Sequence, residues 1–211
     1  MKISRLLFAA LVGATPALAQ PADQIIYPSS DNRVLDVDGD GFGDASHAED
    51  ADKDTLNIGD NAKNQVWRSV IKFDLRKAQS QIQAAKRVTL HYTVRVRSIK
   101  APREWTVEVV QIKTRAADVI EIDPSGIADD FSTKGEVIHS EPSGVLKNGA
   151  LVSIDVTELV KKAQPSGIFA VRLQLDPATN RDDSDDQIAI FAGSHGINAE
   201  TLRPRLVIDS K

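Results

Sequence analysis

The chain has 211 residues, of which 41% are hydrophobic and 27% charged, and it contains no cysteine. These values are ordinary for a soluble globular protein, and they exclude a collagen-like chain, a wholly disordered chain and a disulfide-stapled domain. The formal net charge is −4, from 26 basic and 30 acidic residues. Because duplex nucleic acid is bound through clustered Lys and Arg on a basic domain, we expect no nucleic-acid partner.

The first 19 residues predict a signal peptide. They contain Lys2 and Arg5 without any acid, then a short apolar stretch, then an Ala-Leu-Ala that ends at Ala19, where we expect cleavage. The apolar stretch is shorter than the roughly 18 residues that a membrane-spanning helix needs, so we expect no membrane span. The sequence therefore predicts a secreted or periplasmic protein, whose residues 20–211 carry 24 basic and 30 acidic residues.

Short runs rich in β-branched and aromatic residues predict strands along most of the chain. In 88–96, Tyr92, Val94 and Val96 alternate with polar residues at the period of two that marks a half-buried strand. The predicted strands cover 24–27, 55–58, 66–73, 88–96, 105–112, 137–139, 151–154, 168–175, 188–191 and 205–208. Gly, Pro, Asn and Ser residues separate many of these runs as turns. We expect an all-β fold, an antiparallel β-sandwich of the jelly-roll type.

One segment predicts a short helix. In 155–162, Asp155 or Thr157 can cap the start, and two lysines lie at the negative end of the helix dipole. No internal repeat and no long linker divides the chain, so we expect residues 20–211 to form a single domain. We also expect a monomer.

An acidic, glycine-rich segment carries the sharpest chemical signal. Within a predicted calcium-binding loop at 36–54, residues 36–44 read DVDGDGFGD, with carboxylates at relative positions 1, 3, 5 and 9 and Gly41 at position 6. Ca²⁺ takes about six to eight oxygen ligands at short range, and this spacing can wrap a loop around one ion. The predicted ligands of a structural Ca²⁺ are Asp36, Asp38, Asp40, Asp44 and the backbone carbonyl of Phe42.

The rest of this segment differs from an EF-hand. Position 12 is His47 instead of Glu, and no helical pattern flanks the loop, so the match is to the shorter calcium loops of extracellular repeats and dockerin-like modules. Glu49, Asp50 or Asp52 is the candidate closing ligand. The alternative is a solvated acidic turn, but carboxylates packed without a cation repel one another. A second acidic run at 182–186 lacks the glycine spacing, and we expect a solvated loop there.

Charge is distributed unevenly along the chain. Residues 31–60 hold ten acids and two bases, whereas residues 86–115 hold eight bases and two acids. Basic and apolar side chains alternate on several predicted strands, so the basic ones share a face. If those strands are neighbours, the face forms a basic stripe that can hold carboxylates; the alternative is an ordinary solvent-facing surface. The predicted ligand-binding residues are Arg68, Lys72, Arg95, Arg97, Arg172 and Trp105.

The two tryptophans have two interpretations. Trp105 or Trp67 can stack on sugar rings, as aromatic residues do in many binding sites. The alternative is that both fill the core, because aromatic residues are only 5% of the chain and a sandwich needs large apolar side chains.

Five segments, in order along the chain, resemble DNRLRE domains, which are also grouped as carbohydrate-binding module family 96. The segments are TLNIG at 55–59, RSVIKFDL at 68–75, AAKRVTL at 84–90, SIDVTELV at 153–160 and RPRLVI at 203–208. The family patterns they resemble are L-x-V-G, R-S-x-L-x-F-D-L, A-x-L-x-L, D-V-T-x-x-V and R-P-x-L-x-V. The resemblance implies a secreted β-sandwich of a kind often attached to polysaccharide-degrading enzymes, with alginate binding in some members. Here the domain stands alone in the sequence, and the calcium-like loop looks inserted before Thr55.

The sequence carries no signature of a catalytic site. It has no Cys, no Gly-x-Ser-x-Gly elbow and no His-Glu-x-x-His motif. His91, Tyr92 and Arg95 are residue types that a polysaccharide lyase uses, without a recognisable pattern. We therefore expect a non-catalytic protein, with lyase activity as a minor alternative.

These features together predict a secreted carbohydrate-binding module. It would bind an acidic polysaccharide such as alginate through the basic sheet face and be stabilised by Ca²⁺. The alternative is an extracellular matrix or adhesion module, whose partner is a cell-surface protein or another copy of the chain.

Overall fold

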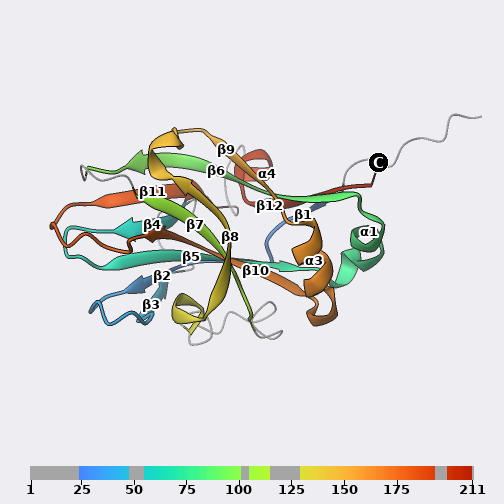
Figure 1. Cartoon of the computed structure of the whole chain (residues 1–211), viewed down its shortest axis with the longest axis horizontal. Helices are drawn as coiled ribbons and strands as arrows, with labels where there is room; N and C mark the ends of the chain where they lie inside the picture. Colours follow the sequence, from blue (N-terminus) through green and yellow to red (C-terminus); the bar gives the residue numbers. More distant parts are fainter. Residues whose placement is uncertain (1–23, 48–54, 101–104, 115–128, 193–198, 211) are drawn as a thin grey trace, which may run out of the picture.

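The computed structural model describes residues 24–47, 55–100, 105–114, 129–192 and 199–210, which form an all-β fold (Figure 1). The strands are β1 (Gln24–Ile26), β2 (Ser30–Asp36), β3 (Ala45–His47), β4 (Thr55–Asp60), β5 (Val66–Asp74), β6 (Arg87–Ser98), β7 (Thr106–Ile112), β8 (Gly135–Pro142), β9 (Leu151–Asp155), β10 (Ile168–Asp176), β11 (Asp186–Phe191) and β12 (Arg205–Asp209). The helical elements are η1 (Arg76–Ala78), α1 (Gln79–Ala84), η3 (Ser143–Val145), α3 (Thr157–Ala163), η4 (Gln164–Ser166) and α4 (Ala199–Leu202).

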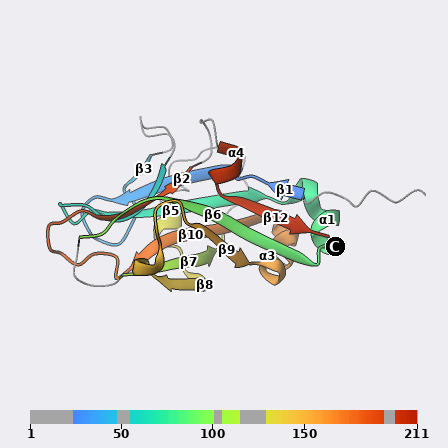
Figure 2. The same ribbon diagram turned by 90° about the horizontal axis from the view of Figure 1, so that it is seen from above.

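The strands form one antiparallel sheet that curls over on itself. Its main path runs β1-β12-β6-β11-β4-β5-β10-β7-β8, while β2 pairs with β3 and β5, and β9 pairs with β6. The long strand β6 joins the two halves, because residues 87–93 pair with β12 and β9 whereas 94–98 pair with β11. Seen from above, β2 lies toward one broad side of the molecule and β8 toward the other (Figure 2). The prediction of an antiparallel β-sandwich is confirmed; its jelly-roll connectivity stays a prediction.

The main core lies inside the curled sheet. Alternate side chains of the strands point into it, such as Ile71 and Phe73 of β5 and Val171 of β10, all without exposed surface. Burying each such side chain stabilises the fold by about 1.5–3 kcal/mol. At one end of the molecule, α1 and α3 add Ile82 and Val160 to this core (Figure 1).

A second, smaller cluster lies on the opposite face of β5 and β10. Val70 and Ala170 belong to it, and Phe131 covers them from a segment that runs through 129–134. We call residues 129–134 the covering segment. This face of β5 and β10 is therefore an interior surface. Some of the predicted binding residues lie on it.

All ten predicted strands have a counterpart, whereas β2 and β3 were not predicted. β2 reads SDNRVLD, whose polar residues hide the strand pattern, yet Asn32 and Asp36 are buried in it. The predicted helix is present as α3, and Asp155 accepts a hydrogen bond from the backbone N–H of Thr157 at 3.1 Å. The short helices α1 and α4 were not predicted.

Some predictions fall on residues that the structure does not describe. The expected signal peptide, 1–19, is one of them. Among the described residues, no helix is both long enough and apolar enough to cross a membrane.

Candidate functional site

The predicted calcium loop is the turn of a β-hairpin. Asp36 ends β2, and β3 returns antiparallel beside that strand. The two carboxylate oxygens of Asp36 accept hydrogen bonds from the backbone N–H groups of Gly39, at 2.7 Å, and Gly41, at 2.9 Å. Gly41 has a φ of +91°, a conformation that glycine adopts without strain. The backbone therefore wraps around Asp36, and we call residues 36–44 the acidic hairpin.

The carboxylates of the acidic hairpin converge. Asp36, Asp38 and Asp40 each offer one oxygen, and these oxygens lie within 4.8 Å of one another. Ligands on opposite sides of a Ca²⁺ lie about 4.8 Å apart, because each is about 2.4 Å from the ion, so the three oxygens fit around one cation. Asp44 is oriented by the backbone N–H of Val37, which donates to its Oδ2 at 2.7 Å. The donor set is therefore the hard, oxygen-only kind that Ca²⁺ prefers.

The remaining predicted ligands are the backbone carbonyl of Phe42 and the candidate closing ligands. The backbone N–H of Phe42 donates to Oδ1 of Asp40 at 2.8 Å, and the Phe42 side chain is exposed. The candidate closing ligands Glu49, Asp50 and Asp52 lie outside the described residues.

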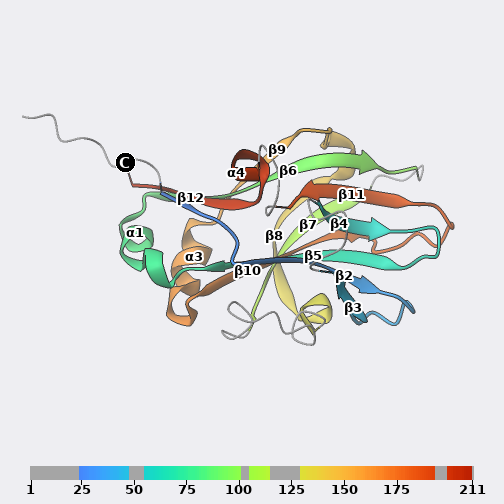
Figure 3. The ribbon, with the colours of Figure 1, turned by 180° about the vertical axis from the view of Figure 1, so that it is seen from behind.

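A pocket of about 320 Å³ opens beside the acidic hairpin. The turn after β4 and the loop after β10 reach this end of the molecule together with the hairpin (Figure 3). Asp36 and Asp38 line one part of the pocket, and Lys63, Arg68 and Arg181 bring three cations to it. The pocket thus combines candidate cation ligands with positively charged side chains.

Arg68, Lys72 and Arg172 lie on one face of two neighbouring strands. β5 and β10 are hydrogen-bonded, and Arg172 is opposite Val70, so the three basic side chains share a face. The expectation that they form a solvent-facing stripe is wrong, because Lys72 is 0% and Arg172 only 6% exposed. The covering segment lies over them.

The covering segment supplies the groups that make this burial tolerable. Lys72 Nζ lies 2.7 Å from the carboxylate of Asp130. Arg172 Nη1 donates to the backbone carbonyls of Asp130, Phe131 and Thr133 at 2.8–2.9 Å. A buried charge is stable only when it is paired or hydrogen-bonded, and both conditions are met here. These two cations hold the fold together at this position.

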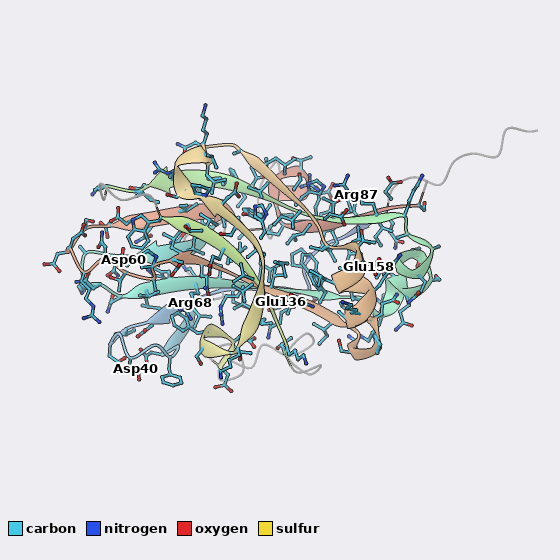
Figure 4. All side chains as sticks on the ribbon, in the orientation of Figure 1. Asp40, Asp60, Arg68, Arg87, Glu136 and Glu158 are labelled. Atoms are coloured by element: carbon cyan, nitrogen blue, oxygen red, sulfur yellow. The ribbon has the colours of Figure 1, made fainter. Side chains whose placement is uncertain are left out.

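Arg68 is the member of the basic set that reaches the pocket (Figure 4). Its Nη1 donates to the backbone carbonyl of Phe131, and its Cζ lies 4.2 Å from the centroid of the Phe131 ring. Burial lowers the pKa of Arg68, and the negative charges of Asp36 and Glu108 partly oppose this shift. Burial and the charge of Arg68 lower the pKa of Arg172 to about 10. Arg68 is therefore a preoriented, partly desolvated cation at the pocket wall.

Arg95 and Arg97 lie elsewhere in the sheet. They belong to β6, which β11 and β4 separate from β5. The Cζ of Arg95 is 5.9 Å from the Phe191 ring, and Arg97 is opposite Ile188 of β11. The structure does not bring these two residues together with Arg68 into one stripe.

The tryptophans occupy different environments. Trp105 is 1% exposed and belongs to the main core, so its ring has no surface on which a sugar can stack. Trp67 is partly exposed, and the Cζ of Arg33 lies 5.3 Å from its ring centroid. Trp105 is therefore a core residue, and the prediction that it contacts a ligand is wrong.

Two pocket residues were missed in the sequence. Lys63 lies in the turn between β4 and β5, and Arg181 lies in the loop between β10 and β11. Lys63 stands between Ala62 and Asn64, and Arg181 precedes an acidic run; a single cation in a loop does not by itself indicate a site. Lys63 and Arg181 are recognised as pocket residues only in the folded structure, where both loops lie beside the acidic hairpin.

The residue types that suggested a lyase are dispersed. Tyr92 has no exposed surface, and burial raises its pKa above the ordinary range. His91 Nδ1 is 2.8 Å from the hydroxyl of Ser153, and burial, with Arg205, lowers the pKa of His91. Neither residue lines the pocket beside the acidic hairpin, and Arg95 packs on Phe191.

No protein-family model matches this chain, and a search of curated proteins finds no significant match. The resemblance to DNRLRE domains stays a prediction that rests on the short motifs.

Proposed function

We propose that this protein is an exported, non-catalytic β-sandwich that binds an acidic polysaccharide such as alginate at the pocket beside the acidic hairpin. The observation that carries the proposal is the joint lining of that pocket by Asp36 and Asp38 and by Lys63, Arg68 and Arg181. A Ca²⁺ held by the acidic hairpin would stabilise this end of the fold. The binding site that we propose is therefore a loop-lined pocket instead of a sheet face.

The chemistry of a uronate matches these groups. Each residue of an acidic polysaccharide carries a carboxylate, which the guanidinium of Arg68 or Arg181 can bind through two parallel hydrogen bonds. Lys63 adds a mobile point charge at the rim. Ca²⁺ takes about six to eight oxygens, more than the three converging carboxylates supply, so sugar hydroxyl or carboxylate oxygens can complete its coordination.

The overall charge of the chain does not oppose this partner. The net charge is −4, but Coulomb attraction over more than about 8–10 Å is screened at physiological salt, so the local balance at the pocket decides binding. A divalent cation bound at the hairpin would cancel two of its negative charges. Binding should consequently weaken in high salt and after chelation.

Affinity electrophoresis in gels that contain alginate tests the proposal. We expect alginate to retard the protein in the presence of Ca²⁺, and we expect less retardation in high salt or with EDTA. A neutral glucan in the gel is the control and should leave migration unchanged. No retardation by any uronate polymer would overturn the proposal.

Two variants locate the site within this experiment. The pocket variant Lys63→Gln/Arg181→Gln should lose most of the retardation, whereas Arg95→Ala/Arg97→Ala should keep it. The reverse result would place binding on β6 and contradict the pocket.

The free edge of the sheet favours a second candidate function, adhesion. β8 ends the strand path and pairs only with β7 among the described strands, and its Val137 is exposed. An open edge can pair with a strand of another chain. Glu136, Glu141 and the terminal Pro142 discourage such pairing, so polysaccharide binding is proposed first. Association that grows with protein concentration, without glycan binding, would favour adhesion.

A further inference from the structure

Another pocket, larger than the one beside the acidic hairpin, opens on the outer face of β7 and β10. Its volume is about 700 Å³, a size that is usual for ligand sites. Three buried apolar side chains line it: Ile112 of β7, and Ile168 and Ala170 of β10. Ala170 is directly opposite Ile112 in the sheet. The pocket therefore has an apolar floor that the sheet itself provides, and residues of β8, α3 and η4 add its walls.

Three lysines from three different parts of the chain line this pocket, which we call the lysine pocket. Lys113 follows β7, Lys134 ends the covering segment, and Lys162 lies in α3. All three are exposed, and none of them forms an ion pair within the part of the chain that the structure describes. Glu136 is the one acid among the described lining residues, and it lies between Arg68 and α3 along the length of the molecule (Figure 4). A local excess of positive charge in an acidic chain attracts an anion.

The lysine pocket and the pocket beside the acidic hairpin lie along one sheet face. Lys72 of β5 is opposite Ala170 in the floor of the lysine pocket, whereas Arg68, four residues earlier on β5, lines the other pocket. Four residues of a strand span about 13 Å, at about 3.3 Å per residue. The covering segment contributes to both pockets, because Phe131 lines the one beside the acidic hairpin and Lys134 lines the lysine pocket. The two pockets are therefore neighbours on either side of this segment.

From this arrangement we infer that the lysine pocket is a second subsite for the acidic polysaccharide, so that one chain crosses the covering segment and places carboxylates in both pockets. The inference rests on the proposed function and extends the path of the polymer beyond the first pocket. The three ammonium groups bind uronate carboxylates as mobile point charges. Gln111 and Glu136, which also line the pocket, can hydrogen-bond sugar hydroxyls, and the apolar floor can receive the C–H face of a sugar ring.

A polymer accounts for the two pockets better than a small anion does. A small anion in one pocket leaves the cations of the other without a ligand. A polyuronate carries a carboxylate on every sugar, so binding in one pocket holds further carboxylates close to the other. The second contact is then intramolecular, and it raises the overall affinity without any change in either pocket.

Lysine footprinting tests the two pockets separately. We would acetylate the protein with and without oligoalginate, in the presence of Ca²⁺, and measure the modification of each lysine by peptide mass spectrometry. Oligoalginate should lower the acetylation of Lys63 in the first pocket and of the three lysines of the lysine pocket. It should leave unchanged Lys77 and Lys147, which are exposed and lie outside both pockets.

The pattern of protection separates this inference from the proposed function. Protection of Lys63 alone would overturn the second subsite and leave the proposed function standing. Protection of the three lysines of the lysine pocket without Lys63 would support the subsite and contradict the pocket beside the acidic hairpin. No protection in either pocket would overturn both.

Charge removal tests the contribution of the lysine pocket to affinity. Lys113→Gln/Lys134→Gln changes two exposed side chains, so its melting temperature should be that of wild type. It should bind oligoalginate about fivefold to thirtyfold more weakly in calorimetric titration, as expected for the loss of two exposed charge contacts. The matched control Lys77→Gln/Lys147→Gln should bind as wild type does. Equal affinities of these two variants would overturn the inference, even if Lys63→Gln/Arg181→Gln still weakened binding.

Discussion

The Nζ atom of Lys72 lies 2.7 Å from the carboxylate of Asp130, and the two side chains are 0% and 5% exposed. This pair joins β5 to the covering segment. Arg172 donates to three backbone carbonyls of the same segment, so two buried cations hold it against the sheet. Lys72 and Arg172 therefore act within the protein and not on a ligand.

Removing one partner of this pair should be costly. Lys72→Met leaves the Asp130 carboxylate buried without its cation, and such a loss destabilises a protein by about 3–5 kcal/mol. Urea denaturation would measure the free energy of unfolding. Arg76→Met breaks an exposed pair with Asp74 and should have a much smaller effect, because solvent screens exposed ion pairs. Equal, small effects of both changes would contradict the structural role of Lys72.

Chelation should lower the melting temperature. An ion at about 100 times its dissociation constant adds about 2.7 kcal/mol, and a chain of this size shifts by about 2–4 °C per kcal/mol, so we expect a fall of roughly 5–10 °C in EDTA. Differential scanning fluorimetry measures this. Asp38→Asn/Asp40→Asn should reduce the fall, and a variant that responds to EDTA as strongly as wild type would argue against the hairpin site.

Trp105 should matter for stability and not for binding. Its complete burial predicts a loss of about 3–5 kcal/mol in Trp105→Ala. The milder Trp105→Phe keeps an aromatic ring in the core and should bind alginate as wild type does. Weakened alginate binding by a well-folded Trp105→Phe protein would restore the sugar-stacking interpretation.

Stability should fall in mild acid because of His91. Burial first, then Arg205 and Arg87, lower the pKa of His91 below its usual 6.5. The folded state thus binds the proton less readily than the unfolded state, so stability is full above about pH 6.5 and declines as the pH falls toward the folded-state pKa. Urea unfolding at several pH values should show a smaller decline in His91→Gln. Identical pH profiles would exclude His91 as a cause.

The strands with strong alternation could be predicted from the sequence. Segments such as 66–73 and 168–175 direct alternate apolar side chains into the main core, and this gives the sequence a local period of two. β2 could not be predicted, because its burial depends on pairing with β5 and its own residues are largely polar.

The acidic hairpin was recognised because its spacing is local. The role of Arg68 and Arg172 could not be recognised in the same way, since Phe131, which accepts hydrogen bonds from both, lies 63 and 41 residues away.

Calorimetric titration of oligoalginate into the protein with Ca²⁺ present tests the central claim most directly. Two exposed charge contacts at about 0.5–1 kcal/mol each correspond to roughly fivefold to thirtyfold in affinity. We predict that Lys63→Gln/Arg181→Gln weakens binding by this factor, whereas Lys77→Gln/Lys147→Gln, which removes the same charge from exposed positions outside the pocket, leaves it unchanged. Equal affinities for the two variants, or no binding by the wild-type protein, would contradict the account.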